Sequence, residues 1–164
     1  MYQPKTHGFS VQGSSPASPA IGSPVLRLLR NFGAGLVGLV AALLAIAAVT
    51  AAGGALIPPL ASVDASDWKS INAHIREYSF AQLMVPFCAH AAGPLVGAYF
   101  GALIAASHKL VVAFSIGALF LIAGSYMVYL ISSSPLWFSA LDLCVAYLPM
   151  SWLGWRLATA SKRA

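Results

Sequence analysis

The sequence predicts an all-α membrane protein: a transmembrane four-helix bundle with up-down-up-down topology and a short amphipathic helix in the first outer loop. Of its 164 residues, 59% are hydrophobic and 8% are charged, whereas soluble domains carry about 25% charged residues. Four apolar runs, uncharged except for one aspartate in the last, are each long enough to cross about 30 Å of hydrocarbon as a helix. Two of the connections between them are so short that successive helices must be antiparallel neighbours.

The chain divides into a tail and one membrane domain. Residues 1–23 are rich in Ser, Pro, Gly and Gln and lack apolar periodicity, which predicts a disordered cytoplasmic tail. Residues 24–164 form the four-helix transmembrane domain. Its predicted spans are residues 32–57, 79–106, 110–131 and 136–156. Pro58 and Pro59 end the first span because proline has no N–H to donate to a helix.

The first span has an alternative interpretation as a cleaved signal peptide. Basic residues precede it and small residues follow around Thr50, Ala51 and Ala52, as at a cleavage site. The apolar run is longer than the core of a typical signal peptide. We therefore predict that the helix is retained.

Lysine and arginine are unevenly distributed between the two ends of the predicted bundle. The end that carries the termini has seven: Lys5, Arg27, Arg30, Lys109, Arg156, Lys162 and Arg163. The other end has only Lys69 and Arg76. Because basic loops stay in the cytoplasm, both termini are predicted to be cytoplasmic. The same rule accounts for the net charge of +5. We therefore predict that the protein contacts the lipid bilayer and does not bind nucleic acid.

The one long loop, residues 58–77, leads into an amphipathic pattern. Its apolar residues recur at intervals of 3, 4 and 3: Trp68, Ile71, Ile75 and Tyr78. That spacing is one face of a helix, and Asp64 or Ser66 can cap its start. We predict a short helix that covers the outer end of the bundle. Docking of a partner and gating of a substrate are the alternatives.

The second span carries small residues at every fourth position: Ala89, Gly93, Gly97, Gly101 and Ala105. Such a G-x-x-x-G stripe lets helix backbones approach closely in a membrane. The stripe predicts either packing within the bundle or a self-association face. Pro86 and Pro94 in the same span each remove a backbone donor and predict a kink.

Asp142 is the single carboxylate inside a span, where a charge costs a few kcal/mol. Counting 1.5 Å per residue along antiparallel helices places Thr50, Gln82, Ser125 and Tyr126 at its depth. Its expected partners are therefore hydroxyl and amide groups. Asp142 is a candidate for a polar clasp between helices, an acid reached by water, a proton or cation relay, or a catalytic acid.

His90 lies near the midplane, at the depth of Tyr147, with Cys88 and Cys144 slightly further out. Cys88 and His90 point to different sides of a helix, so we predict no metal site and expect both cysteines to pack as small apolar residues. The predicted polar intramembrane candidates are Asp142, His90, Gln82, Tyr126 and Tyr147.

Three segments carry a resemblance to a known group: A-L-I-P-P-L in the first span, A-H-A-A-G-P-L-V-G-A-Y-F-G-A-L-I-A-A in the second, and P-L-W-F-S-A-L-D-L-C-V-A-Y-L-P-M-S-W-L-G-W-R-L-A in the fourth. Residues 32–158 resemble a family of uncharacterised bacterial four-helix integral membrane proteins. The resemblance implies a bacterial inner (cytoplasmic) membrane. Members of that family often have a Glu and a His just before the proline pair, but residues 50–57 contain neither.

No common catalytic, nucleotide-binding or haem motif is present, so we predict a protein that is not an enzyme and has no cofactor. The favoured function is packing or association with itself or with another membrane protein, as an accessory protein. The alternative is a small channel or transporter subunit in which Asp142 and His90 line a polar path formed by a dimer. An intramembrane enzyme is a third hypothesis, which would need a second polar cluster.

Overall fold

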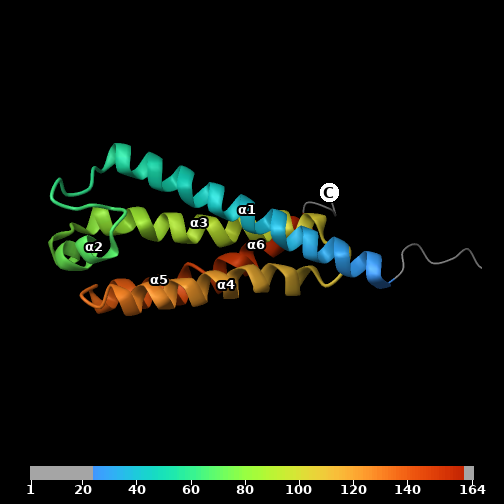
Figure 1. Ribbon diagram of the computed structural model, residues 1–164. Coiled ribbons are helices and arrows are strands. Elements are labelled where there is room, and N and C mark those ends of the chain that lie inside the picture. Colours follow the sequence, from blue (N-terminus) through green and yellow to red (C-terminus); the bar gives the residue numbers. More distant parts are fainter. Residues whose placement is uncertain (1–23, 161–164) are drawn as a thin grey trace, which may run out of the picture.

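The computed structural model describes residues 24–160, which contain helices and no strand. The predicted tail, residues 1–23, and the basic residues Lys162 and Arg163 lie outside the described residues. The long helices are α1 (Pro24–Leu56), α3 (Phe80–Ile104), α4 (Lys109–Leu130) and the consecutive pair α5 (Leu136–Val145) and α6 (Leu148–Ala160). They run up and down as a bundle (Figure 1).

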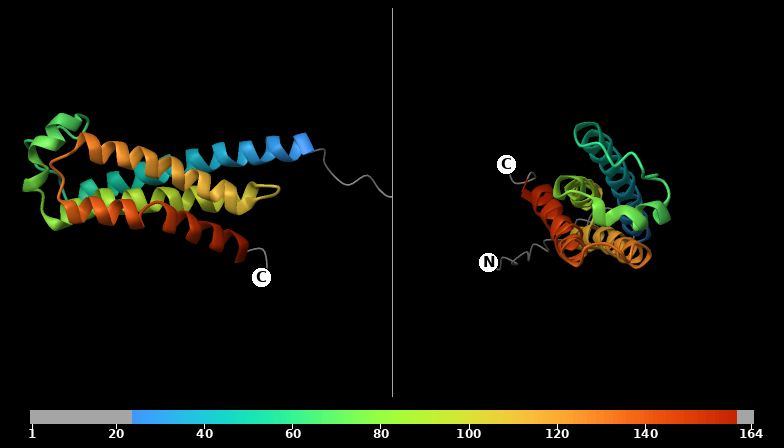
Figure 2. Two further views of the ribbon diagram at one scale, coloured as in Figure 1. Left: turned by 90° about the horizontal axis from the view of Figure 1, so that it is seen from below. Right: turned by 90° about the vertical axis from the view of Figure 1, so that its left-hand side faces the viewer.

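Four helical segments are long and apolar enough to cross a membrane, counting α5 and α6 together. The predicted all-α four-helix bundle is therefore confirmed, and the protein is a multi-pass membrane protein. Figure 2 shows Pro24, Ala160 and the α3–α4 turn at one end, which we call the terminal end. The short helix α2 (Trp68–His74) and the α4–α5 turn lie at the opposite end, which we call the α2 end.

The small-residue stripe of α3 packs against α1 inside the bundle. All five stripe residues are buried, and so are the α1 residues with matching spacing, Ala34, Gly38 and Ala42. A Cβ atom on Gly97 would lie 2.7 Å from the carbonyl oxygen of Gly38 and 2.8 Å from the Cβ of Ala42. These two helices approach backbone to backbone, as small residues allow in a membrane. The stripe is thus buried inside the bundle, with its glycines against α1, as the prediction of packing within the bundle expects.

Helix α6 packs as closely against α3 and α4 in the terminal half of the bundle. Gly154 of α6 lies against the carbonyl of Leu95, and Gly117 of α4 lies against Ser151 of α6. Ile116 of α4 is also fully buried, and its side chain contacts α1 at Gly38 and α3 at Gly97. No side chain larger than hydrogen fits at Gly117 or Gly154 without movement of the neighbouring helix.

Helix α1 begins at Pro24, well before the predicted residue 32. Proline suits the first turn of a helix because its missing N–H is not needed there. The predicted start at residue 32 is where the uncharged run begins. The helix itself extends further toward the N-terminus, past Arg30 and Arg27. Asn31 explains the extension, because its carboxamide oxygen accepts hydrogen bonds from the backbone N–H groups of Ala106 and Ser107 at 2.9 and 3.2 Å.

The fourth span, predicted over 136–156, is present as one candidate membrane span, Leu136–Ala160, and it consists of two consecutive helices. Helix α5 ends at Val145 and α6 begins at Leu148. Pro149 causes the interruption, since it has no N–H for the carbonyl of Val145 four residues earlier and its ring crowds that carbonyl. By contrast, α3 continues as one helix through Pro86 and Pro94.

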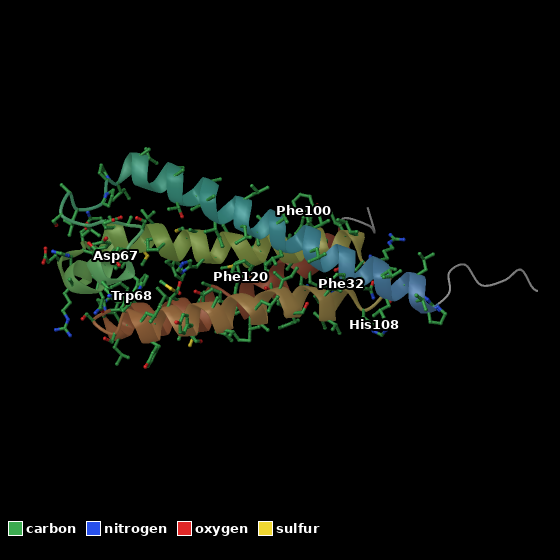
Figure 3. The ribbon with its side chains drawn as sticks, in the orientation of Figure 1. Phe32, Asp67, Trp68, Phe100, His108 and Phe120 are labelled. Atoms are coloured by element: carbon green, nitrogen blue, oxygen red, sulfur yellow. The ribbon has the colours of Figure 1, made fainter. Side chains whose placement is uncertain are left out.

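The predicted amphipathic helix is present as α2 and a following 3-10 turn, Ile75–Glu77. Its N-cap is Asp67, which accepts from the N–H of Lys69 at 3.0 Å, and not Asp64 or Ser66 as predicted. Those two residues form a turn of their own. Ile75 is buried in a cluster with Leu83 of α3 and Phe138 of α5, so the helix covers the end of the bundle. Asp67 and Trp68 lie at this end in Figure 3.

Candidate functional site

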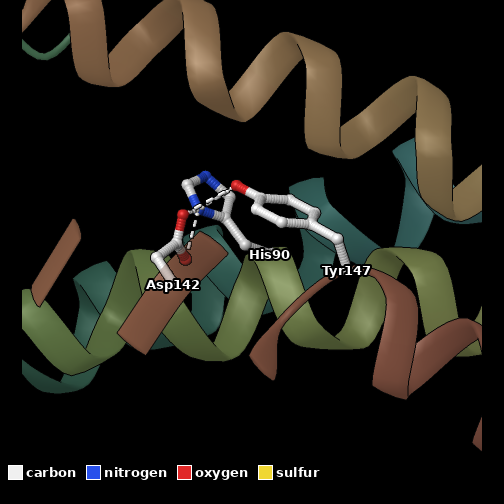
Figure 4. Close-up of polar contacts among 3 residues, drawn as sticks. All are labelled: His90, Asp142 and Tyr147. Atoms are coloured by element: carbon white, nitrogen blue, oxygen red, sulfur yellow. Dashed lines mark hydrogen bonds and ion pairs between the residues drawn. The ribbon is translucent and has the colours of Figure 1, made fainter. Parts of the chain in front are cut away.

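Three polar side chains meet in the middle of the bundle. Nδ1 of His90 lies 3.0 and 3.1 Å from the two carboxylate oxygens of Asp142. The hydroxyl of Tyr147 donates to Oδ2 of Asp142 at 2.7 Å and lies 3.3 Å from Nδ1 of His90. Figure 4 shows the three groups converging from α3, α5 and the α5–α6 break. We call this set the His–Asp–Tyr cluster.

The local backbone explains why these three residues meet. In an unbroken helix, residues five apart point about 140° away from each other. Tyr147 lies in the break between α5 and α6, next to Pro149, and its side chain therefore turns back to Asp142. His90 faces both from α3, with its ring stacked on that of Tyr147 at a centroid distance of 6.0 Å.

Burial differs among the three groups. Asp142 is 3% exposed and Tyr147 is 2% exposed, whereas the His90 side chain retains 36% of its surface. With Asp142 ionised, Nδ1–H of His90 and the hydroxyl of Tyr147 both donate to it, so its charge is stabilised by two hydrogen bonds. Nε2 of His90 then carries a free lone pair, and it points away from the other two residues (Figure 4). His90 is the accessible member of the cluster.

A cavity of about 310 Å³ occupies the α2 half of the bundle, and the cluster lies at its deep end. The walls come from α1, α3, α4 and α5, and residues of the α2 region close the top. Most of the lining is apolar, for example Ile57, Ile71, Leu83, Val85, Val128 and Phe138. A ligand-sized space with a few converging polar groups is the usual form of a small-molecule site.

Beyond the cluster, toward the terminal end, the bundle is closely packed. Ser151 of α6 lies one turn beyond Tyr147 and is fully buried. Its hydroxyl has no hydrogen-bond partner among residues 24–160, although buried hydroxyls are normally paired. It faces Gly117 of α4. On this side of the cluster, the hydroxyl of Ser151 therefore lies in a tight contact between α6 and α4.

Counting the helical rise along the sequence predicted the depths of the candidate residues but not all of their contacts. It placed His90 and Tyr147 at one level, and these residues are in contact. Asp142 was expected to bond to the layer of Thr50, Gln82, Ser125 and Tyr126, and this was wrong because equal depth does not mean facing sides.

Thr50 and Gln82 line the cavity without touching Asp142. The side chain of Gln82 completes a capping box with Ser79 and donates to the carbonyl of Pro58 at 2.9 Å, so it has a structural role. The hydroxyl of Ser125 donates to Leu121 of its own helix. Tyr126 is 61% exposed on the outside of the bundle.

The two cysteines, which were expected to pack as small apolar residues, lie on the outside of the bundle. Cys88 and Cys144 are free thiols and both are exposed. His90 points into the bundle from the same helix as Cys88, because the two are separated by two positions. Among residues 24–160, no three His, Cys, Asp or Glu side chains lie close enough together to hold a metal ion.

Comparison with known proteins adds no functional assignment. No family model, curated protein or solved structure matches the chain. The functional argument therefore rests on the His–Asp–Tyr cluster and its cavity.

Proposed function

We propose that this protein is a small membrane transporter in which the His–Asp–Tyr cluster takes up and releases a proton. The observation that supports the proposal is the position of His90, hydrogen-bonded to a buried carboxylate and exposed to a cavity within an otherwise apolar bundle. Ionisable groups inside a membrane are costly, and where they persist they commonly mark ion or proton pathways.

The proton chemistry follows from the two ring nitrogens of His90. The lone pair on Nε2 accepts an excess proton that reaches the cavity as hydronium, which releases water and gives an imidazolium cation next to the Asp142 carboxylate. The Nδ1–H proton then passes to an oxygen of Asp142, and the ring is left neutral with its hydrogen on Nε2. Tyr147 donates to the other carboxylate oxygen throughout and holds Asp142 in place.

A transporter fits the packing better than an open channel. The cavity reaches the cluster from the α2 half, while beyond it Gly117, Ser151 and Gly154 form tight helix contacts. Access from the terminal end would require α6 to move, and the break at Ala146 and Tyr147 offers a hinge. Discontinuous helices beside the binding site are frequent in secondary transporters.

The cavity and the packing of α3 bear on the two functions expected from the sequence. A polar path was expected to need a dimer, but the residues that line the cavity all come from a single chain. The association hypothesis relied on the glycine stripe of α3, which packs against α1. Neither self-association nor an accessory partner has a further observation in its favour.

For the orientation, we propose a bacterial inner membrane with both termini in the cytoplasm. Four of the described basic residues lie at the terminal end, with no acidic residue there: Arg27, Arg30, Lys109 and Arg156. The α2 end carries two bases and three acids: Lys69, Arg76, Asp64, Asp67 and Glu77. The positive-inside rule then directs the terminal end to the cytoplasm.

Thiol labelling in intact cells tests this orientation. In a background with Cys88→Ser and Cys144→Ser, Ala73→Cys in α2 should react with a membrane-impermeant maleimide, whereas Ala160→Cys should react only after lysis. The opposite pattern would reverse the orientation, and the proton site would then open to the cytoplasm.

Proton flux into proteoliposomes tests the transport function. A potassium gradient with valinomycin supplies the driving potential, and a trapped pH dye reports proton entry. Wild-type protein should carry protons above the rate of empty vesicles, and Asp142→Asn should lower that excess by at least about tenfold because it removes the carboxylate. Absence of flux in wild type, or undiminished flux in Asp142→Asn, would overturn the proposal.

Two substitutions at His90 separate the roles of its nitrogens. In His90→Asn the amide nitrogen takes the place of Nδ1 and retains a donor for Asp142, but Nε2 is lost. In His90→Gln the amide reaches the position of Nε2, but the bond to Asp142 is lost. Both should abolish the flux, since neither amide titrates. His108→Asn, at the opposite end of the bundle, is the matched control and should leave the flux unchanged.

A further inference from the structure

We propose that the cavity binds a small organic monocation: a protonated amine with an apolar body, whose ammonium group donates to Nε2 of His90. The inference rests on the proposed function, because it names the class of ligand that would compete with the proton at His90. It is carried by the cavity, its apolar walls and the unbalanced carboxylate at its deep end.

The size of the cavity limits the ligand. An engineered cavity of about 150 Å³ holds one benzene ring. By proportion, the cavity of about 310 Å³ accommodates roughly twelve non-hydrogen atoms. Aliphatic side chains such as Ile57, Val85 and Val128 line it, so most of these atoms must be carbon.

The charge of the deep end favours a cation. Asp142 is the only carboxylate in the cavity lining, and no lysine or arginine is among the lining residues. Its two donors, His90 and Tyr147, are neutral side chains in the state described above, so the cluster bears one negative charge. In surroundings of low dielectric constant, an ammonium group near this charge is strongly favoured over a neutral or anionic head group.

The hydrogen-bonding atoms direct the ligand to His90. Asp142 and Tyr147 are almost completely buried, and their polar atoms are engaged with each other. Nε2 of His90 is the remaining acceptor of the cluster (Figure 4), and no hydrogen bond to it is formed within residues 24–160. An ammonium N–H that donates to Nε2 is linked through the ring to the Asp142 carboxylate.

A proton and the ammonium ligand exclude each other at this nitrogen. Nε2 has one lone pair, which either binds a proton or accepts one hydrogen bond. The other titratable groups that line the cavity are Asp142 from α5, Tyr147 from the break and Tyr78 from the α2 end, while α1 and α4 contribute none. A ligand bound at Nε2 should therefore block proton uptake by His90.

The entrance also suits an amphipathic ligand. Thr50 of α1 and Met127 of α4 both line the cavity and are both exposed. These helices pack together toward the terminal end, where a Cβ on Gly38 of α1 would meet Ile116 of α4, and α1 diverges from α4 toward the α2 end (Figure 1). An amine with an apolar body can enter between them from the adjoining lipid.

Three compounds of one shape and different charge test the proposal: 4-phenylbutylammonium, 4-phenylbutanol and 4-phenylbutanoate. Their binding is measured by isothermal titration calorimetry with the full chain in lipid nanodiscs, and empty nanodiscs correct for partitioning. Wild-type protein should bind the ammonium at least about tenfold more tightly than the alcohol, and the carboxylate least.

Variants identify the site and guard against misfolding. Asp142→Asn should bind the ammonium and the alcohol equally, and its retained alcohol binding shows that the cavity is intact. His90→Asn should bind the ammonium at least about tenfold more weakly than wild type, because the Nε2 acceptor is absent. Equal binding of the three compounds by wild type, or a preference for the carboxylate, would overturn the inference.

The flux assay separates this inference from the proposed function. Proton flux without ammonium binding would leave the transporter proposal standing and overturn the organic cation. Ammonium binding without any proton flux would support the binding site and overturn the transport function.

Discussion

Gly97 of α3 and Gly38 of α1 meet backbone to backbone. A Cβ atom on Gly97 would lie 2.7 Å from the carbonyl oxygen of Gly38, and one on Gly38 would lie 2.6 Å from that of Gly97. Real Cβ contacts are longer, and a backbone carbonyl cannot rotate away as a side chain can. This contact fixes the position of α1, which forms one wall of the cavity.

Gly97→Ala should therefore destabilise the protein, by about 1–3 kcal/mol, because the added methyl group overpacks the contact. Gly35→Ala is the matched control: a Cβ there meets nothing within 4 Å, and alanine is favoured over glycine in a helix by about 1 kcal/mol. Unfolding in mixed micelles, followed by circular dichroism, should show opposite shifts. Shifts of the same sign and size would contradict the close contact.

Asn31 is expected to hold the terminal end of α1 to the α3–α4 turn. Besides its two backbone donors, its Nδ2 donates to the hydroxyl of Ser107 at 3.0 Å. Asn31→Ala leaves two N–H groups without their partner and should cost about 2 kcal/mol of stability. Asn31→Asp retains the acceptor oxygen and should lose less than half of that in the same unfolding measurement. Equal losses of stability in Asn31→Ala and Asn31→Asp would mean that the hydrogen bond from Nδ2 to Ser107 matters more than the acceptor oxygen.

The spans could be predicted from the sequence because hydrocarbon thickness converts directly into the length of an uncharged run. The ends of the helices could not be predicted in this way, because helices such as α1 continue beyond the uncharged run. The glycine stripe predicted a close contact, but its partner required knowing that α1 carries Ala34, Gly38 and Ala42 at matching spacing.

The His–Asp–Tyr cluster was half predictable. Helical rise gives depth, and depth placed His90 level with Tyr147. It does not give the direction in which a side chain points, so Asp142 was assigned to other partners. The available signal was Pro149, which breaks the helix and turns Tyr147 toward Asp142.

Tyr147→Phe removes one of the two hydrogen bonds that Asp142 receives. Its buried carboxylate would lose a donor, so we expect a stability loss of about 1–3 kcal/mol and a reduced proton flux. Tyr129→Phe makes the same chemical change on a side chain that is 78% exposed, and it should alter neither quantity. A Tyr147→Phe protein with wild-type stability and flux would show that the hydroxyl does not hold Asp142.

The turn before α2 should loosen in acid. The hydroxyl and amide of Ser66 donate to Asp64, which lowers the pKa of that carboxyl below its ordinary value of 3.8. A carboxyl whose pKa is depressed by folding contributes stability above the ordinary pKa and loses it as the pH falls through the lowered value. Protection of the Ser66 amide from hydrogen exchange should therefore decrease below about pH 3.8. Asp64→Asn should remove this pH dependence, and a persistent dependence would point to another group.

Pro149→Ala tests whether the break between α5 and α6 serves transport. Alanine restores an N–H for the carbonyl of Val145, so the fourth span can become one helix. This gain is offset by loss of the hydrogen bond from Tyr147 to Asp142, so the free energy of unfolding should change little. The continuous helix would turn Tyr147 about 140° from Asp142, and proton flux should fall as far as in Tyr147→Phe. Pro149→Gly removes the ring without favouring the helix and should retain most of the flux. A Pro149→Ala protein with full flux would mean that the break shapes the fold alone and that the hinge lies elsewhere in the chain.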